Sequence, residues 1–67
     1  MNIEIRGENI QLQQLLKVAG VVSMGGEVKG LLAEGAILVN DVVATERRKK
    51  IVPGDTVRVG EVVITVA

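Results

Sequence analysis

Four consecutive basic residues, Arg47-Arg48-Lys49-Lys50, are the densest concentration of chemistry in this sequence. They carry four of its eight positive charges, whereas the eight acidic residues are scattered singly. Guanidinium and ammonium groups neutralise and hydrogen-bond phosphate oxygens, so the run could contact a nucleic-acid backbone. It could equally be a solvated loop. The net charge of zero argues against indiscriminate attraction to nucleic acid or anionic lipid.

Two further lysines fall in segments with helical periodicity. Lys17 lies in the first such segment, and Lys29 lies in the first turn of the second, beside the expected free amides of Gly25, Gly26 and Glu27. Free amides at a helix start can bind a phosphate. Each lysine could instead be an ordinary surface residue, and the two glycines lack the further Gly and Lys-Ser/Thr of a triphosphate loop.

The two remaining arginines are interpreted differently. Arg6 and Arg58 fall in segments with strand-like alternation, so we interpret them as charges on the surface of a sheet. Arg58 could pair with a nearby acid, an interaction worth about 0–1 kcal/mol at a surface.

The residue types that the chain lacks exclude most catalytic and metal chemistry. Cys and His are absent, which removes the commonest zinc ligands, the commonest general base and the commonest nucleophile–base pair. We therefore expect no enzymatic activity, no cofactor and no metal site. Phe, Tyr and Trp are also absent, so an RNA target should be a folded or double-helical element rather than unstacked bases.

The spacing of apolar residues predicts a small α+β domain. A chain of 67 residues can bury one core, so we expect a single domain over residues 1–67. Its predicted elements are a strand over 1–6, helices over 12–19 and 25–34, β-rich runs over 36–39 and 42–45, and strands over 56–59 and 62–66. This order predicts a helix pair covering one face of a small, mainly antiparallel sheet.

Two helix ends and two turns separate these elements. Gly20 and Gly35 should end the two helices. Asn40-Asp41 should form a tight hairpin turn, and Pro53-Gly54 a type II turn.

The N-terminus and the apolar segments bear on localisation. The alternation at residues 3–6 is unlike a signal peptide, and the apolar segments are interrupted every few residues. We expect a cytoplasmic, monomeric chain without membrane contact.

Two stretches resemble the core signature of the S-four domain family, which is named after a protein of the small ribosomal subunit. Residues 31–40 read LLAEGAILVN and residues 52–59 read VPGDTVRV, as the family's Gly, Val-Asn and Gly-Asp positions require. Residues 15–20 resemble its first helix. Residues 25–29 are close to the Gly-Gly-Glu-Ala-Lys opening of the second helix in small stand-alone bacterial members. The similarity covers roughly residues 2–66.

The resemblance implies the S-four-like (alpha-L) fold and a non-catalytic RNA-binding module. Family members present basic residues of two helices and a neighbouring loop to structured RNA, such as ribosomal or transfer RNA, and ribosome assembly or translation is the implied context. The candidate RNA-binding residues are drawn from the helix pair and the basic run: Lys17, Gly25, Gly26, Lys29, Arg47, Arg48, Lys49 and Lys50.

Three positions depart from the family pattern. Met24-Gly25 stands where many members have Ser-Arg, which removes a hydroxyl cap and a phosphate-binding guanidinium. Asp41 replaces the usual Gly after Val-Asn and puts an acid on the hairpin tip. Residues 46–50, ERRKK, replace Arg-Arg-Gly-Arg-Lys and keep most of the positive patch.

A protein-interaction module is the alternative function. The segment Val62–Val66 has strand-like composition and no charged residue to discourage pairing, so it could add to the sheet of a partner as an exposed edge. In that case, charge reversal at residues 47–50 should leave binding intact, while a Pro at Val63 or Ile64 should abolish it.

Overall fold

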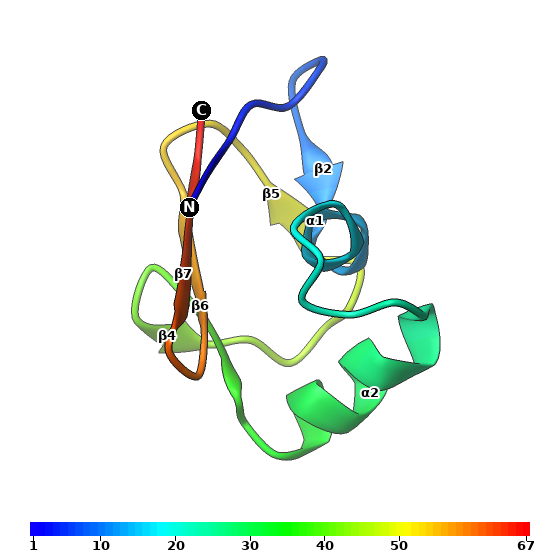
Figure 1. Ribbon diagram of the computed structural model, residues 1–67. Helices are drawn as coiled ribbons and strands as arrows, with labels where there is room; N and C mark the ends of the chain where they lie inside the picture. The colour runs from blue at the N-terminus through cyan, green and yellow to red at the C-terminus, as the bar shows by residue number, and fades with distance from the viewer.

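In the computed structural model, a five-stranded sheet lies beside two helices (Figure 1). The structure describes residues 1–24 and 26–67. The strands are β1 (Asn2–Ile3), β3 (Ile37–Val39), β4 (Val42–Val43), β6 (Thr56–Val59) and β7 (Val62–Val66). Their order in the sheet is β1-β7-β6-β3-β4, and every pair except β1 with β7 is antiparallel. The predicted α+β class with a mainly antiparallel sheet is confirmed.

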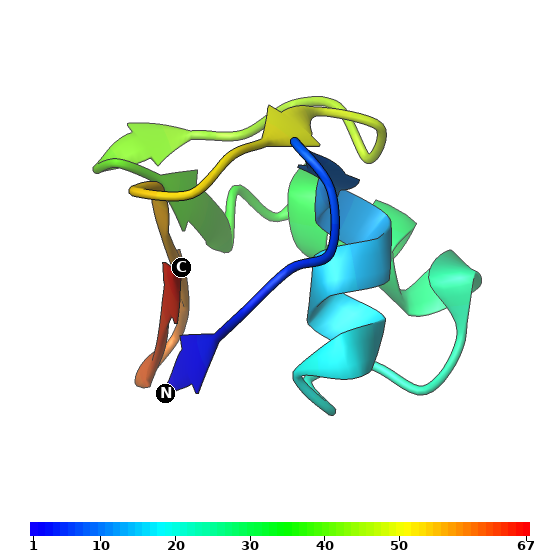
Figure 2. The same ribbon diagram turned by 90° about the horizontal axis from the view of Figure 1, so that it is seen from above.

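Both helices lie on the same side of this sheet (Figures 1 and 2). They are α1 (Leu12–Val18) and α2 (Gly25–Ala33), within a residue or two of the predicted ranges. Gly20 and Gly35 follow the helices with φ of 75° and 68°, as the left-handed position after a helix requires. No helix among the described residues is long and apolar enough to span a membrane.

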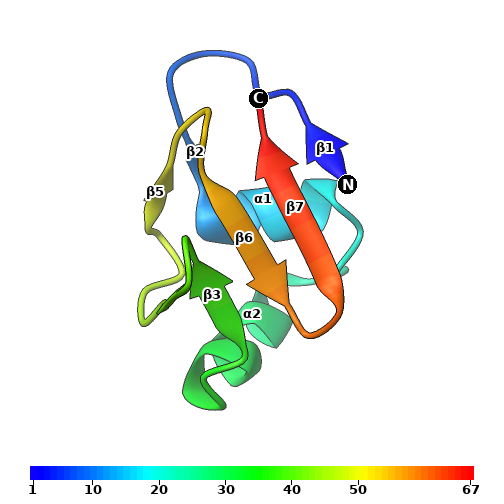
Figure 3. The same ribbon diagram turned by 90° about the vertical axis from the view of Figure 1, so that its left-hand side faces the viewer.

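The period-two pattern of the strands decides which face of the sheet is buried. Ile37 pairs with Val59, Val39 with Val57, and Val57 with Ile64, and all of these side chains are buried against the helices. The residues between them point to the other face, which no helix covers (Figure 3). Leu12, Leu15, Leu16 and Val28 close the core from the helix side.

Two predicted turns have the expected backbone. Asn40 and Asp41 both have positive φ, 50° and 66°, as a type I′ hairpin turn requires. Asp41 therefore fills a position where Gly is usual, because Asp tolerates this region better than most residues. At the second turn, Gly54 has a φ of 101°, and the Asp55 amide donates to the carbonyl of Val52 at 3.1 Å.

A small second sheet was not predicted. In it, β2 (Ile10–Gln11) pairs antiparallel with β5 (Lys50–Ile51). Two-residue strands are too short to show a period, and the partners are far apart in sequence. Lys50, which we expected in the same loop as residues 47–49, therefore lies in a strand. The predicted strand over 1–6 is also shorter than expected, since only Asn2–Ile3 pair as β1.

The expectation that Val62–Val66 forms an exposed sheet edge is wrong. This segment, β7, lies between β6 and β1, because the N-terminal segment pairs with it in parallel. The Thr65 amide donates to the carbonyl of Met1, and the Ala67 amide to that of Ile3. The edges of the sheet are β1 and β4 instead.

Candidate functional site

The backbone of the basic run is attached to the start of α1. The amides of Leu12 and Gln13 donate to the carbonyls of Lys49 at 2.9 Å and Arg47 at 3.0 Å. The first amides of a helix have no partner within the helix, and the residue before α1, Gln11, makes no side-chain cap. Carbonyls of the basic run therefore take the place of a cap, and this fixes the run relative to α1.

Arg47 extends from this run toward α2. It lines a shallow depression together with Lys29, Leu32, Ala33 and Thr45. Lys29 and Arg47 come from elements 18 residues apart in sequence, and the fold brings them to one hollow. Two cations beside a shallow, partly apolar hollow suit the sugar–phosphate backbone of a nucleic acid.

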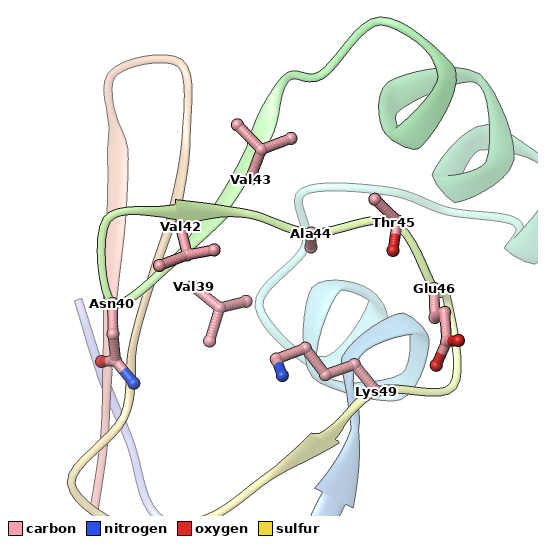
Figure 4. A pocket seen from close by; sticks show the side chains of 8 residues that line it. All are labelled: Val39, Asn40, Val42, Val43, Ala44, Thr45, Glu46 and Lys49. Atoms are coloured by element: carbon pink, nitrogen blue, oxygen red, sulfur yellow. The ribbon is translucent and has the colours of Figure 1, made fainter.

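Lys49 extends to the other side of the run. Its side chain points into a hollow beside β4, lined by Val39, Asn40, Val42 and neighbouring residues (Figure 4). Its charge is the smallest of the influences that lower the pKa of Asp55. Lys49 and Arg47 consequently line different hollows.

The other two basic residues of the run occupy the turn and the small sheet. Arg48 lies in the turn and lines a third depression with Glu46 and Arg47. Lys50 pairs with Gln11 across the β2–β5 ribbon. Gln11 in turn accepts a hydrogen bond from the side chain of Gln13 at 2.8 Å. The side-chain amides of Gln11 and Gln13 were not among the candidate residues. Only the β2–β5 pairing, which was not predicted, brings them close to Lys50.

Lys17 lies apart from Lys29 and Arg47. It is exposed in the last turn of α1 and lines a separate depression with Arg6, on the side of the N-terminal segment. Arg6 itself follows β1 in a bend, so its expected place on a strand is wrong. The structure thus brings together only part of the candidate set.

The start of α2 is poorly suited to an anion. Met24 precedes the helix without a side-chain cap, as the absent Ser predicts. Glu27 places a carboxylate in the first turn, and its side chain accepts a hydrogen bond from the Ser23 hydroxyl at 2.9 Å. Gly26 is exposed there, whereas Gly25 lies outside the described residues. Lys29, expected in the first turn, is the fifth residue of α2.

Most charged side chains make no ion pair within the part of the chain that the structure describes. Across residues 1–24 and 26–67, the one ion pair joins Arg58 to Asp41 at 3.2 Å, on the uncovered face of the sheet. The predicted pairing of Arg58 is therefore confirmed, and the basic run has no carboxylate within ion-pair distance. The described residues contain no group of three or more His, Cys, Asp or Glu that could hold a metal ion.

Comparisons with known proteins agree with the fold described above. The family model described as the S4 domain matches residues 3–67. Over 57 residues the chain is 42% identical to the probable ribosome maturation protein RlbA of Bacillus subtilis (strain 168), which covers 85% of this chain and 80% of the relative. Over 49 residues it is 41% identical to the putative RNA-binding protein YbcJ of Escherichia coli (strain K12), which covers 73% of this chain and 70% of the relative.

Proposed function

This chain belongs to the S4 domain family, the S-four family of the sequence comparison above, and on that basis we propose that it is a non-catalytic module that binds structured RNA. The observation that carries the proposal is the shared hollow of Lys29 and Arg47, beside a basic run whose backbone is fixed to α1. A fixed backbone lowers the conformational entropy that the backbone of the run loses on binding.

The chemistry of this surface favours a folded RNA over a single strand. With no aromatic residue in the chain, the surface lacks the stacking platforms that hold unpaired bases in single-strand binders. Cations arranged along α2 and the basic run would instead contact phosphates and 2′-hydroxyls of a helical element. The names of the relatives, a probable ribosome maturation protein and a putative RNA-binding protein, favour ribosomal RNA and a cytoplasmic role in ribosome assembly or translation.

A salt titration tests the proposal. The purified protein is titrated with a structured ribosomal RNA hairpin over a series of salt concentrations, beside a variant in which residues 47–50 are all changed to Gln. Affinity should fall steeply with log salt, with a slope that reports the number of phosphates contacted, and the variant should bind weakly with a shallower slope. Arg58→Gln is the matched control, because Arg58 is paired with Asp41 on the uncovered sheet face.

One outcome of the salt titration would contradict the RNA proposal. If the variant and the wild type bind the hairpin alike, and no more tightly than an unrelated acidic polymer, then the basic run is a solvated turn and the RNA proposal fails.

A sheet-edge interaction remains the second candidate, now at β4. Val42 and Val43 are 68% and 51% exposed on this edge strand. An exposed apolar edge strand can pair with a strand of another chain. The Ala44 amide donates to Ile37, so the intervening Val43 amide points away from the sheet. Val43→Pro should therefore abolish strand addition while keeping the β3–β4 bonds. RNA binding that survives this change would separate the two functions.

A further inference from the structure

A hollow lies on the side of α1 opposite the Lys29–Arg47 depression. Its volume is about 630 Å³, within the range of roughly 300–1,000 Å³ that small-molecule sites occupy. Its lining residues come from the segment that runs from β1 to β2 and from the helix α1, two elements that Figure 2 shows. The RNA surface proposed above makes no use of this groove, and Lys17 lines the groove rather than the Lys29–Arg47 depression.

The floor of the groove is aliphatic. Ile3, Ile5 and Ile10 pack against the core yet remain partly exposed, and Val18 at the end of α1 is 66% exposed. These side chains form a surface that is apolar and accessible. Enzymes that hold a flipped base cover its faces with aromatic or aliphatic side chains, so an aliphatic floor can support a base.

The rim of the groove is polar and has capacity for hydrogen bonds. Asn9 and Gln14 lie on opposite walls, and within the described residues neither side chain makes a hydrogen bond to another residue. Each amide offers both a donor and an acceptor. Arg6 and Lys17 add two cations without a carboxylate in ion-pair distance.

We propose that this groove accepts a single unpaired nucleotide of the bound RNA, an inference that rests on the proposed function. The base lies on Ile5, Ile10 and Val18, the Asn9 and Gln14 amides bond its polar edge, and Arg6 or Lys17 meets its phosphate. Glu4 also lines the groove, so its charge disfavours a ligand with several phosphates.

The groove and the proposed RNA surface share no lining residue, but both adjoin α1. Gln14 lines the groove, and the preceding residue, Gln13, donates its amide to the carbonyl of Arg47. An RNA helix held at the basic run would thus place its neighbouring nucleotides near Gln14. The Asn9 and Gln14 amides match a base edge, which presents donors and acceptors together, as each amide does.

The test compares a plain ribosomal RNA hairpin with four versions of it that carry a one-nucleotide bulge, one for each of the four nucleotides. Wild-type protein should bind at least one bulged hairpin roughly tenfold more tightly than the plain one, as about two hydrogen bonds would supply. The double variant Asn9→Ala/Gln14→Ala should lose this preference and keep its affinity for the plain hairpin. Asn2→Ala, an exposed amide outside the groove, should change neither.

A second variant tests whether the aliphatic side chains of the groove contact the base. Val18→Gln should reduce the bulge preference, while Val63→Gln, an exposed valine on the uncovered sheet face, should not. Equal affinity of the wild type for plain and bulged hairpins would overturn the nucleotide site and point to a protein partner for the exposed aliphatic floor. Failure to bind the plain hairpin would instead sink the proposed function itself, and the nucleotide site with it.

Discussion

The side chains of Asn40 and Asp55 are hydrogen-bonded to each other, Nδ2 to Oδ1 at 3.0 Å, across 15 positions of sequence. Asn40 also accepts the amide of Thr56 at 2.9 Å, and Asp55 accepts the amide of Val52 at 2.9 Å. These bonds tie the β3–β4 hairpin to the turn before β6. Asn40 of the Val-Asn pair and Asp55 of the Gly-Asp pair thus belong to one hydrogen-bonded connection.

This connection should be measurable as a coupling free energy. Asn40→Ala and Asp55→Ala each remove bonds to a partly exposed site, so each should lower the free energy of unfolding by about 1–2 kcal/mol. The double variant should cost less than the sum, because the Asn40–Asp55 bond is lost only once. Urea unfolding of the four proteins gives the coupling. Strict additivity would show that the two residues act independently.

Stability should also depend on pH through Asp55. The amide of Val52, then the Asn40 side chain, lower the pKa of Asp55 below its ordinary value of 3.8. A carboxyl whose pKa is lower in the folded state than in the unfolded chain stabilises the fold above the unfolded value and loses this contribution as the pH falls. The wild type should therefore lose stability as the pH drops below about 5.

The variant Asp55→Asn isolates this effect, since it cannot titrate at this position. Its free energy of unfolding should start lower and fall less steeply on acidification than that of the wild type. Glu8→Gln, a change in the exposed loop after β1, is the control. Parallel acid profiles for wild type and Asp55→Asn would contradict the role assigned to Asp55.

Two glycines should respond in opposite directions to the same substitution. Gly54 has a φ of 101°, which an alanine tolerates poorly, so Gly54→Ala should lower the free energy of unfolding by about 1–3 kcal/mol. Gly26 lies in α2 without positive φ, and an added Cβ would meet nothing within 4 Å. Gly26→Ala should therefore stabilise the protein by about 0.4–1 kcal/mol. Thermal unfolding distinguishes the two, and destabilisation by Gly26→Ala would mean that the start of α2 is not a regular helix.

The sequence was sufficient for the features that rest on local patterns. Helical spacing at Leu12, Leu15 and Leu16 and the turn chemistry of Asn40-Asp41 predict their elements correctly, because propensity and burial agree there. The β2–β5 ribbon and the β1–β7 pairing depend on contacts between distant segments, and no local pattern records those. For the same reason the sequence identifies the basic residues but does not predict that Arg47 and Lys49 line different hollows. Their side chains leave the run in different directions.

The basic residues lie on two sides of α1, and this leads to a prediction about Lys17. Lys29 and Arg47 share one depression, whereas Lys17 lies with Arg6 in the groove on the other side of α1. If the plain RNA hairpin is held at the first depression, then Lys29→Gln and Arg47→Gln should each weaken its binding and lower the salt slope by about one. Lys17→Gln should leave plain-hairpin affinity almost unchanged and reduce the affinity for the bulged hairpin. Equal losses on both hairpins for all three variants would show that the cations on the two sides of α1 contact one continuous RNA backbone, and the separation of the two surfaces would then be wrong.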